Sequence, residues 1–164
     1  MYLKFELEGD IHDSLHCVPL CVRRKLDLAA LKISLDGWRA LTRAERLALC
    51  HLPIDGEGDR AVYREVLQGF CARAGVPLSP LGDPDASALR WNEPGVPGAL
   101  RTALASLGLA LADPRWRALP EEARYALLKL ARPGHDLARL HAACAELGLC
   151  QGAPPALTDG PCRA

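Results

Sequence analysis

Apolar positions recur at helical spacing along two stretches of the chain. The set after Pro19 is spaced by 4, 3 and 4 residues, namely Val22, Leu26, Ala29 and Ile33. The set after Pro97 keeps the same register, namely Leu100, Leu104, Leu107 and Leu111. Such spacing places each set on one face of a helix, and proline is favoured at the first helical position. We therefore predict two matching amphipathic helices that begin at the two prolines.

These stretches belong to a longer internal repeat. Trp38-Arg39-Ala40-Leu41 recurs as Trp116-Arg117-Ala118-Leu119, at an offset of 78 residues. At this offset residues 18–53 align with 96–131 without a gap, and 13 of the 36 pairs are identical. The period is too long for a solenoid, so the pattern predicts an all-α fold, a tandem duplication of a small bundle with about four helices per half.

Capping signals mark the later helices of each half. They are Ser34, Thr42 with Glu45, and Asp59 in the first half, and Asp113, Pro120 and Asp136 in the second. Gly75 and Gly148 suit the ends of the fourth helices. The predicted organisation is an acidic arm (1–17), a first half (18–75), a Pro-rich linker (76–95), a second half (96–150) and a flexible tail (151–164). Loose alternation over residues 2–8 predicts that the arm is short and extended.

Each half is small for an independent core, so we expect the halves to pack together through the apolar faces of their first helices.

Charge is distributed unevenly, although the net charge is zero. Residues 1–15 carry four acidic side chains and one basic one, whereas residues 16–46 carry seven basic and three acidic ones. The arm either lies on the basic first helix, or each forms half of a docking surface.

The composition restricts the function classes. A zero net charge gives no global attraction to nucleic acid or to a membrane surface. No uncharged apolar run reaches the length of a transmembrane helix, and the first residues do not resemble a signal peptide. We expect a cytoplasmic protein with no nucleic-acid or membrane partner, and hence seven reduced cysteines.

No catalytic motif is present: neither a phosphate-binding glycine loop nor a metalloprotease or serine-hydrolase signature occurs. We therefore predict no enzyme activity, no cofactor and no metal. Cys17 and Cys21 lie near His16 and form one Cys-x3-Cys spacing, which is a weak metal pattern. Cys17 also precedes a predicted helix start, where a thiol becomes more reactive. A Cys17-based redox or metal site is therefore kept as the less favoured alternative.

Tryptophan and arginine recur together as Trp38/Arg46 and Trp116/Arg124. The simpler interpretation is that each tryptophan fills a helix junction and each arginine covers it. The alternative is a ligand or partner pocket made twice. The candidate binding residues are Cys17, Arg23, Lys25, Trp38, Arg46, Arg101, Trp116 and Arg124.

Several framework segments resemble the nitrate reductase-associated protein family. They are Phe5-Glu-Leu-Glu, Ser14-Leu-His-Cys17-Val-Pro19, Val22-Arg23-Arg-Lys25-Leu26-Asp27, and Lys32-Ile-Ser-Leu35 with Trp38. The resemblance implies an association with assimilatory nitrate reductase and molybdopterin cofactor synthesis, but it carries over no catalytic residue. It favours a non-enzymatic accessory protein that binds nitrate reductase or molybdopterin-cofactor proteins. The alternative is a small-molecule or cofactor-binding helical module, its cleft lined by Arg23, Arg46, Arg101 or Arg124.

Overall fold

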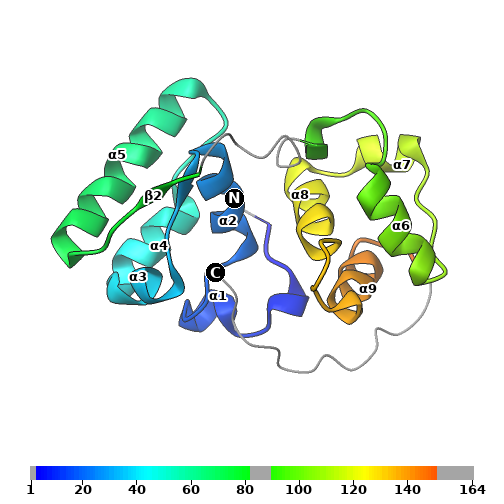
Figure 1. Cartoon of the computed structure of the whole chain (residues 1–164), viewed down its shortest axis with the longest axis horizontal. Helices are drawn as coiled ribbons and strands as arrows, with labels where there is room; N and C mark the ends of the chain where they lie inside the picture. Colours follow the sequence, from blue (N-terminus) through cyan, green and yellow to red (C-terminus); the bar gives the residue numbers. More distant parts are fainter. Residues whose placement is uncertain (1–2, 82–89, 151–164) are drawn as a thin grey trace. The chain divides into compact units, whose positions relative to one another are not determined.

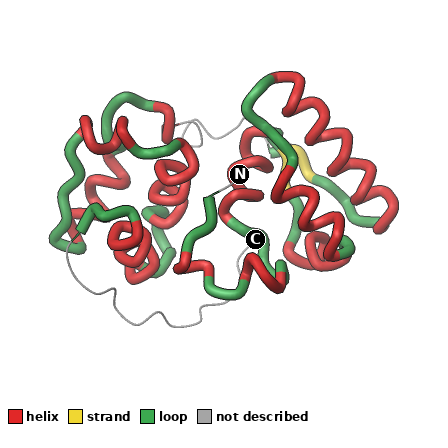
Figure 2. Tube along the Cα trace, turned by 180° about the vertical axis from the view of Figure 1, so that it is seen from behind, coloured by secondary structure: helices red, strands yellow, loops and turns green. Residues whose placement is uncertain are grey.

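The computed structural model describes residues 3–81 and 90–150, and they divide into two compact units. Among the described residues, unit 1 comprises 3–4 and 8–81, and unit 2 comprises 5–7 and 90–150. Nearly all of the regular structure is helical (Figure 1, Figure 2). The predicted tail, residues 151–164, and the middle of the predicted linker, residues 82–89, lie outside the described residues.

The main elements of unit 1 are five helices and two short strands. They are α1 (Ile11–Ser14), α2 (Leu20–Leu28), β1 (Leu31–Lys32), α3 (Leu35–Ala40), α4 (Arg43–His51), α5 (Glu57–Ala74) and β2 (Ser79–Pro80). Helix α4 packs against both α2 and α5, and the strands pair antiparallel, with Leu31 opposite Pro80. The core contains the large buried side chains Leu15, Trp38, Leu49, Ile54, Tyr63 and Leu67. The strands correct the all-α prediction, because the fold is mostly helical with a small two-stranded sheet.

Unit 2 is built around α8. Its elements are the 3-10 helices η1 (Glu6–Glu8, of which residues 6–7 belong here) and η2 (Arg90–Asn92), with α6 (Gly98–Ser106), α7 (Asp113–Ala118), α8 (Glu121–Leu130) and α9 (Leu137–Glu146). Helix α8 packs against α6, α9 and η2. Trp91 and Tyr125 meet edge to face, with ring centroids 5.1 Å apart. Both are buried with Leu100, Trp116, Leu127 and Leu140.

Several predicted caps are confirmed. The Ser34 side chain accepts the Gly37 N–H, and Thr42 and Glu45 form a reciprocal capping box. Asp136 caps α9 through the Ala138 N–H, and Gly75 ends α5 in the left-handed region.

Asp59 also bonds the start of its helix, although from the third helical position, where it accepts the Gly56 N–H. Asp113 is not an N-cap: α7 begins at Asp113 itself, after Ala112. Its carboxylate instead accepts the Val96 N–H.

The amphipathic helices are shorter than predicted. Helix α2 ends at Leu28 and α6 at Ser106, and Pro19 and Pro97 are their N-caps rather than their first helical residues. Ala30 and Gly108 adopt positive φ, of 54° and 70°, which is incompatible with continuing a right-handed helix. Apolar periodicity missed these ends because the chain turns and still buries later stripe residues.

The N-terminal arm is not simply extended. Residues 6–8 form η1, and Ile11–Ser14 form α1. No helix among the described residues is both long enough and apolar enough to cross a membrane.

The offset of 78 residues seen in the sequence also relates helix starts, because α2 begins at Leu20 and α6 at Gly98. It relates α3, starting at Leu35, to α7, starting at Asp113, as well.

Candidate functional site

Trp38 and Arg46 both hold one backbone carbonyl in unit 1. The fully buried Trp38 donates its Nε1–H to the Leu15 oxygen at 2.8 Å. Nη1 of Arg46 donates to the same oxygen at 2.7 Å. Leu15 has a φ of +52°, a conformation that is uncommon for a residue other than glycine. The pair therefore fixes the turn that leads into α2, as the simpler sequence interpretation expects.

Unit 2 contains a related arrangement. Nε1 of the buried Trp116 donates to the Glu93 oxygen at 2.9 Å. Glu93 follows Leu15 by the same offset of 78 residues that separates the two tryptophans. The Arg124 guanidinium carbon lies 5.8 Å from the centroid of the Trp116 ring, within the range of a cation–π contact. Trp116 and Arg124 are therefore brought together in unit 2.

Arg23 and Arg101 make one contact in common. Nε of Arg23 donates to the Val18 oxygen at 2.9 Å, and Nε of Arg101 donates to the Val96 oxygen at 3.0 Å. Arg101 also forms an ion pair with Asp113, which accepts the Val96 N–H at 2.9 Å. The Val96 bond, together with Arg101, holds the pKa of the Asp113 carboxyl below its usual value, despite an opposing effect of desolvation. Both arginines thus fasten the segment before a helix.

Lys25 is an interior helix cap. Its side chain is buried, and Nζ donates to the oxygens of Cys50 at 2.6 Å, Leu52 at 2.5 Å and Leu49 at 3.3 Å. The last carbonyls of a helix have no intrahelical partner, and a cation is favoured there by the helix dipole. Desolvation by burial lowers the Lys25 pKa. Lys25 therefore ties α2 to the end of α4.

A buried thiol pair lies beside this cap. The Cys21 thiol hydrogen-bonds to Cys50, which raises the pKa of Cys21 and lowers that of Cys50, with Lys25 lowering the Cys50 pKa further. The Tyr63 hydroxyl, buried without a hydrogen-bond partner among the described residues, has a pKa raised chiefly by desolvation. The sequence interpretation of Cys50 as a core residue fits its burial, but the pairing with Cys21 was not predicted.

The side chain of Cys17 is buried, with 5% of its surface exposed. Five of the described cysteines are free thiols, namely Cys21, Cys50, Cys71, Cys144 and Cys150. Within 3–81 and 90–150, no group of three or more His, Cys, Asp or Glu side chains is placed to hold a metal ion.

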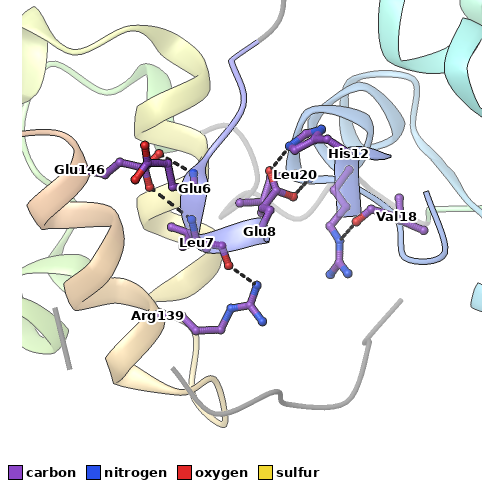
Figure 3. A network of polar contacts seen from close by, with 9 residues as sticks. Glu6, Leu7, Glu8, His12, Val18, Leu20, Arg139 and Glu146 are labelled. Carbon is purple, nitrogen blue, oxygen red and sulfur yellow. Dashed lines mark hydrogen bonds and ion pairs between the residues drawn. The ribbon is translucent and has the colours of Figure 1, made fainter. Parts of the chain in front are cut away.

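Two side chains of α9 bind the backbone of the arm, a contact that sequence analysis did not predict (Figure 3). The Glu146 carboxylate accepts the Glu6 N–H at 2.6 Å and, more weakly, the Leu7 N–H at 3.5 Å. Nη2 of Arg139 donates to the Leu7 oxygen at 3.4 Å. Phe5 and Leu7 are buried, at 4% and 7% exposure, while Glu6 is exposed. We call Arg139 and Glu146 the arm-binding site.

The next residue of the arm, Glu8, is bonded within unit 1. Its buried carboxylate accepts the Leu20 N–H at 2.8 Å, at the start of α2, and lies 2.8 Å from Nε2 of His12 (Figure 3). An acceptor at a helix N-terminus satisfies an otherwise unpaired donor and is favoured by the helix dipole. The backbone thus leaves the arm-binding site at Leu7 and enters unit 1 at Glu8.

The arm-binding site offers a carboxylate to consecutive amide N–H groups and a guanidinium to a carbonyl, the complement of an exposed peptide backbone. A model of the conserved nitrate reductase-associated protein family matches residues 4–147. The chain belongs to this family. Comparisons with curated proteins and with solved structures give no match.

Family membership confirms the resemblance and extends it beyond the segments that carried it. The matched region covers the described part of both units almost completely and includes Arg139 and Glu146. The family's description indicates an association with nitrate reductase.

Proposed function

We propose that this chain is a non-enzymatic accessory protein that acts by binding assimilatory nitrate reductase or a protein that loads its molybdopterin cofactor. The observation that carries the proposal is the family match over residues 4–147. Four of the candidate residues donate hydrogen bonds to backbone carbonyls of this chain, namely Trp38, Arg46, Lys25 and Trp116. These contacts maintain the fold.

The organisation into halves is part of the proposal. We take the two units to derive from one duplicated bundle, because helix starts and the Trp38 and Trp116 bonds recur at one offset. Packing of the halves through α2 and α6 stays a prediction. Superposing α2–α4 on α6–α8 in an experimentally determined structure tests the duplication, and backbones that diverge throughout would contradict it.

Quantitative affinity capture tests the function. The tagged full-length chain is recovered from cells grown on nitrate and from cells grown on ammonium, and co-purifying proteins are identified by mass spectrometry. We expect nitrate reductase or a molybdopterin-cofactor protein to be enriched from the nitrate culture, relative to a tag-only control. Enrichment of neither protein, with both present in the lysate, would contradict the proposal.

A further inference from the structure

The arm-binding site has two properties of a peptide-recognition site. Its hydrogen bonds go to main-chain atoms of Glu6 and Leu7, so they do not depend on which side chains those positions carry. Selectivity comes from the flanking apolar side chains, because Phe5 and Leu7 are buried and the Glu6 side chain between them is exposed. The bound pattern is therefore apolar, any residue, apolar.

The geometry of α9 explains how two side chains grip one short segment. Arg139 and Glu146 are seven residues apart, close to two helical turns, and so lie on the same face of the helix. One supplies positive charge for a carbonyl and the other negative charge for amide N–H groups, so the charges match the polarity of a peptide backbone. The bond between Glu146 and the Glu6 N–H, at 2.6 Å, is the shortest of the three.

The residue that follows this segment is bonded within unit 1. Glu8 bonds Leu20 and His12 in unit 1, and Gly9, with φ of +55°, follows it. Residues 5–7 can leave the arm-binding site without breaking the Glu8 bonds, because those bonds involve a different residue and a different unit. The contacts that a ligand from outside would replace include these three hydrogen bonds, two of them long, and the burial of two apolar side chains.

We propose that the arm-binding site is exchangeable: it takes an apolar-x-apolar segment of a partner protein in place of residues 5–7. This inference deepens the proposed function, since it names the kind of segment that the bound partner presents. The arm then acts as an internal competitor. Because it is tethered, its effective concentration is high, and a free peptide binds detectably only when the arm is weakened.

Fluorescence anisotropy with a labelled peptide tests the exchange. The probe has the sequence of residues 2–8, Tyr-Leu-Lys-Phe-Glu-Leu-Glu. The receptor is the full chain carrying Leu7→Ser, which weakens the arm, and its fold is checked by circular dichroism. We expect saturable binding to this variant and at least about tenfold weaker binding to the unaltered chain. Should Leu7→Ser not fold, Phe5→Ala replaces it.

Two controls separate the proposed contact from non-specific adhesion. Adding Glu146→Ala to the weakened receptor removes the acceptor of both N–H groups and should reduce affinity at least about tenfold, whereas Glu65→Ala, at an exposed glutamate of α5, should leave it unchanged. A probe N-methylated at the residues equivalent to Glu6 and Leu7 lacks both donors and should not bind.

A folded, arm-weakened receptor that fails to bind the probe would overturn the inference, as would binding that persists after Glu146→Ala. A concentration-dependent dimer of the unaltered chain that Leu7→Ser abolishes would assign the site to a second copy, which would also overturn it. The assay contains no nitrate reductase, so its failure is distinguishable from failure of the affinity capture.

Discussion

Replacing Lys25 by Met should lower the free energy of unfolding of unit 1 more than replacing an exposed lysine does. Methionine keeps most of the side-chain length but removes the ammonium that bonds the oxygens of Leu49, Cys50 and Leu52. Because Lys25 is only 6% exposed, little water reaches those oxygens after the change.

The magnitude follows from two opposing contributions. A hydrogen bond to a charged group stabilises by roughly 1.5–3 kcal/mol, and a buried acceptor left unpaired costs about 1–3 kcal/mol. Removing the ammonium also removes the cost of burying a charge, which offsets part of that loss. With two short bonds and one longer bond lost, we expect the free energy of unfolding to fall by about 2–3 kcal/mol.

Native-state amide hydrogen exchange measures this change within unit 1. The matched control is Lys32→Met, since Lys32 is exposed in β1, and it should alter stability by less than about 0.5 kcal/mol. The loss of protection in Lys25→Met should be largest in α4, whose final carbonyls lose their partner. If both variants lie within about 0.5 kcal/mol of the unaltered chain, the assignment of Lys25 as a helix cap is wrong.

Three further predictions concern single groups. Trp116→Phe removes the Nε1–H that bonds the Glu93 oxygen, and we expect unfolding by urea to show a loss of about 1–2 kcal/mol. The pKa of Asp113, measured by NMR, should lie below 3.8 in the folded protein. The ionised carboxylate then stabilises the fold fully above pH 3.8, and this stabilisation is lost as the pH falls through the pKa of the folded state. Asp113→Asn should remove this pH dependence of stability. Burial raises the pKa of Cys144 to about 12. Iodoacetamide at pH 8 should therefore alkylate the partly exposed Cys150 before Cys144. Equal alkylation rates of the two cysteines, measured by mass spectrometry, would contradict this.

Local signals in the sequence were sufficient for most helix starts. The capping residues Ser34, Thr42 and Asp136 act through bonds to N–H groups two or three residues away, and such bonds depend on nearby sequence alone. Helix ends were harder to predict. Ile33 continues the apolar stripe after Pro19 and is buried as expected, yet it follows a turn at Ala30. Burial periodicity therefore does not show where a helix stops.

The arm-binding site could not be found in the same way. Glu146 and Glu6 are 140 positions apart, and neither residue stands out from the other exposed acids by its local pattern. The contact depends on main-chain donors, which every residue except proline carries. The short apolar alternation at Phe5 and Leu7 was the available signal, and it predicted an arm without indicating what the arm contacts.

The proposed function of this protein is to bind another protein. Biolayer interferometry with the purified full-length chain tests this most directly. The immobilised partners are nitrate reductase with its molybdopterin cofactor, nitrate reductase without it, and a purified cofactor-loading protein. We expect saturable binding to at least one of them, unchanged by Glu65→Ala. Absence of binding to all three by a folded chain at micromolar concentration would contradict it.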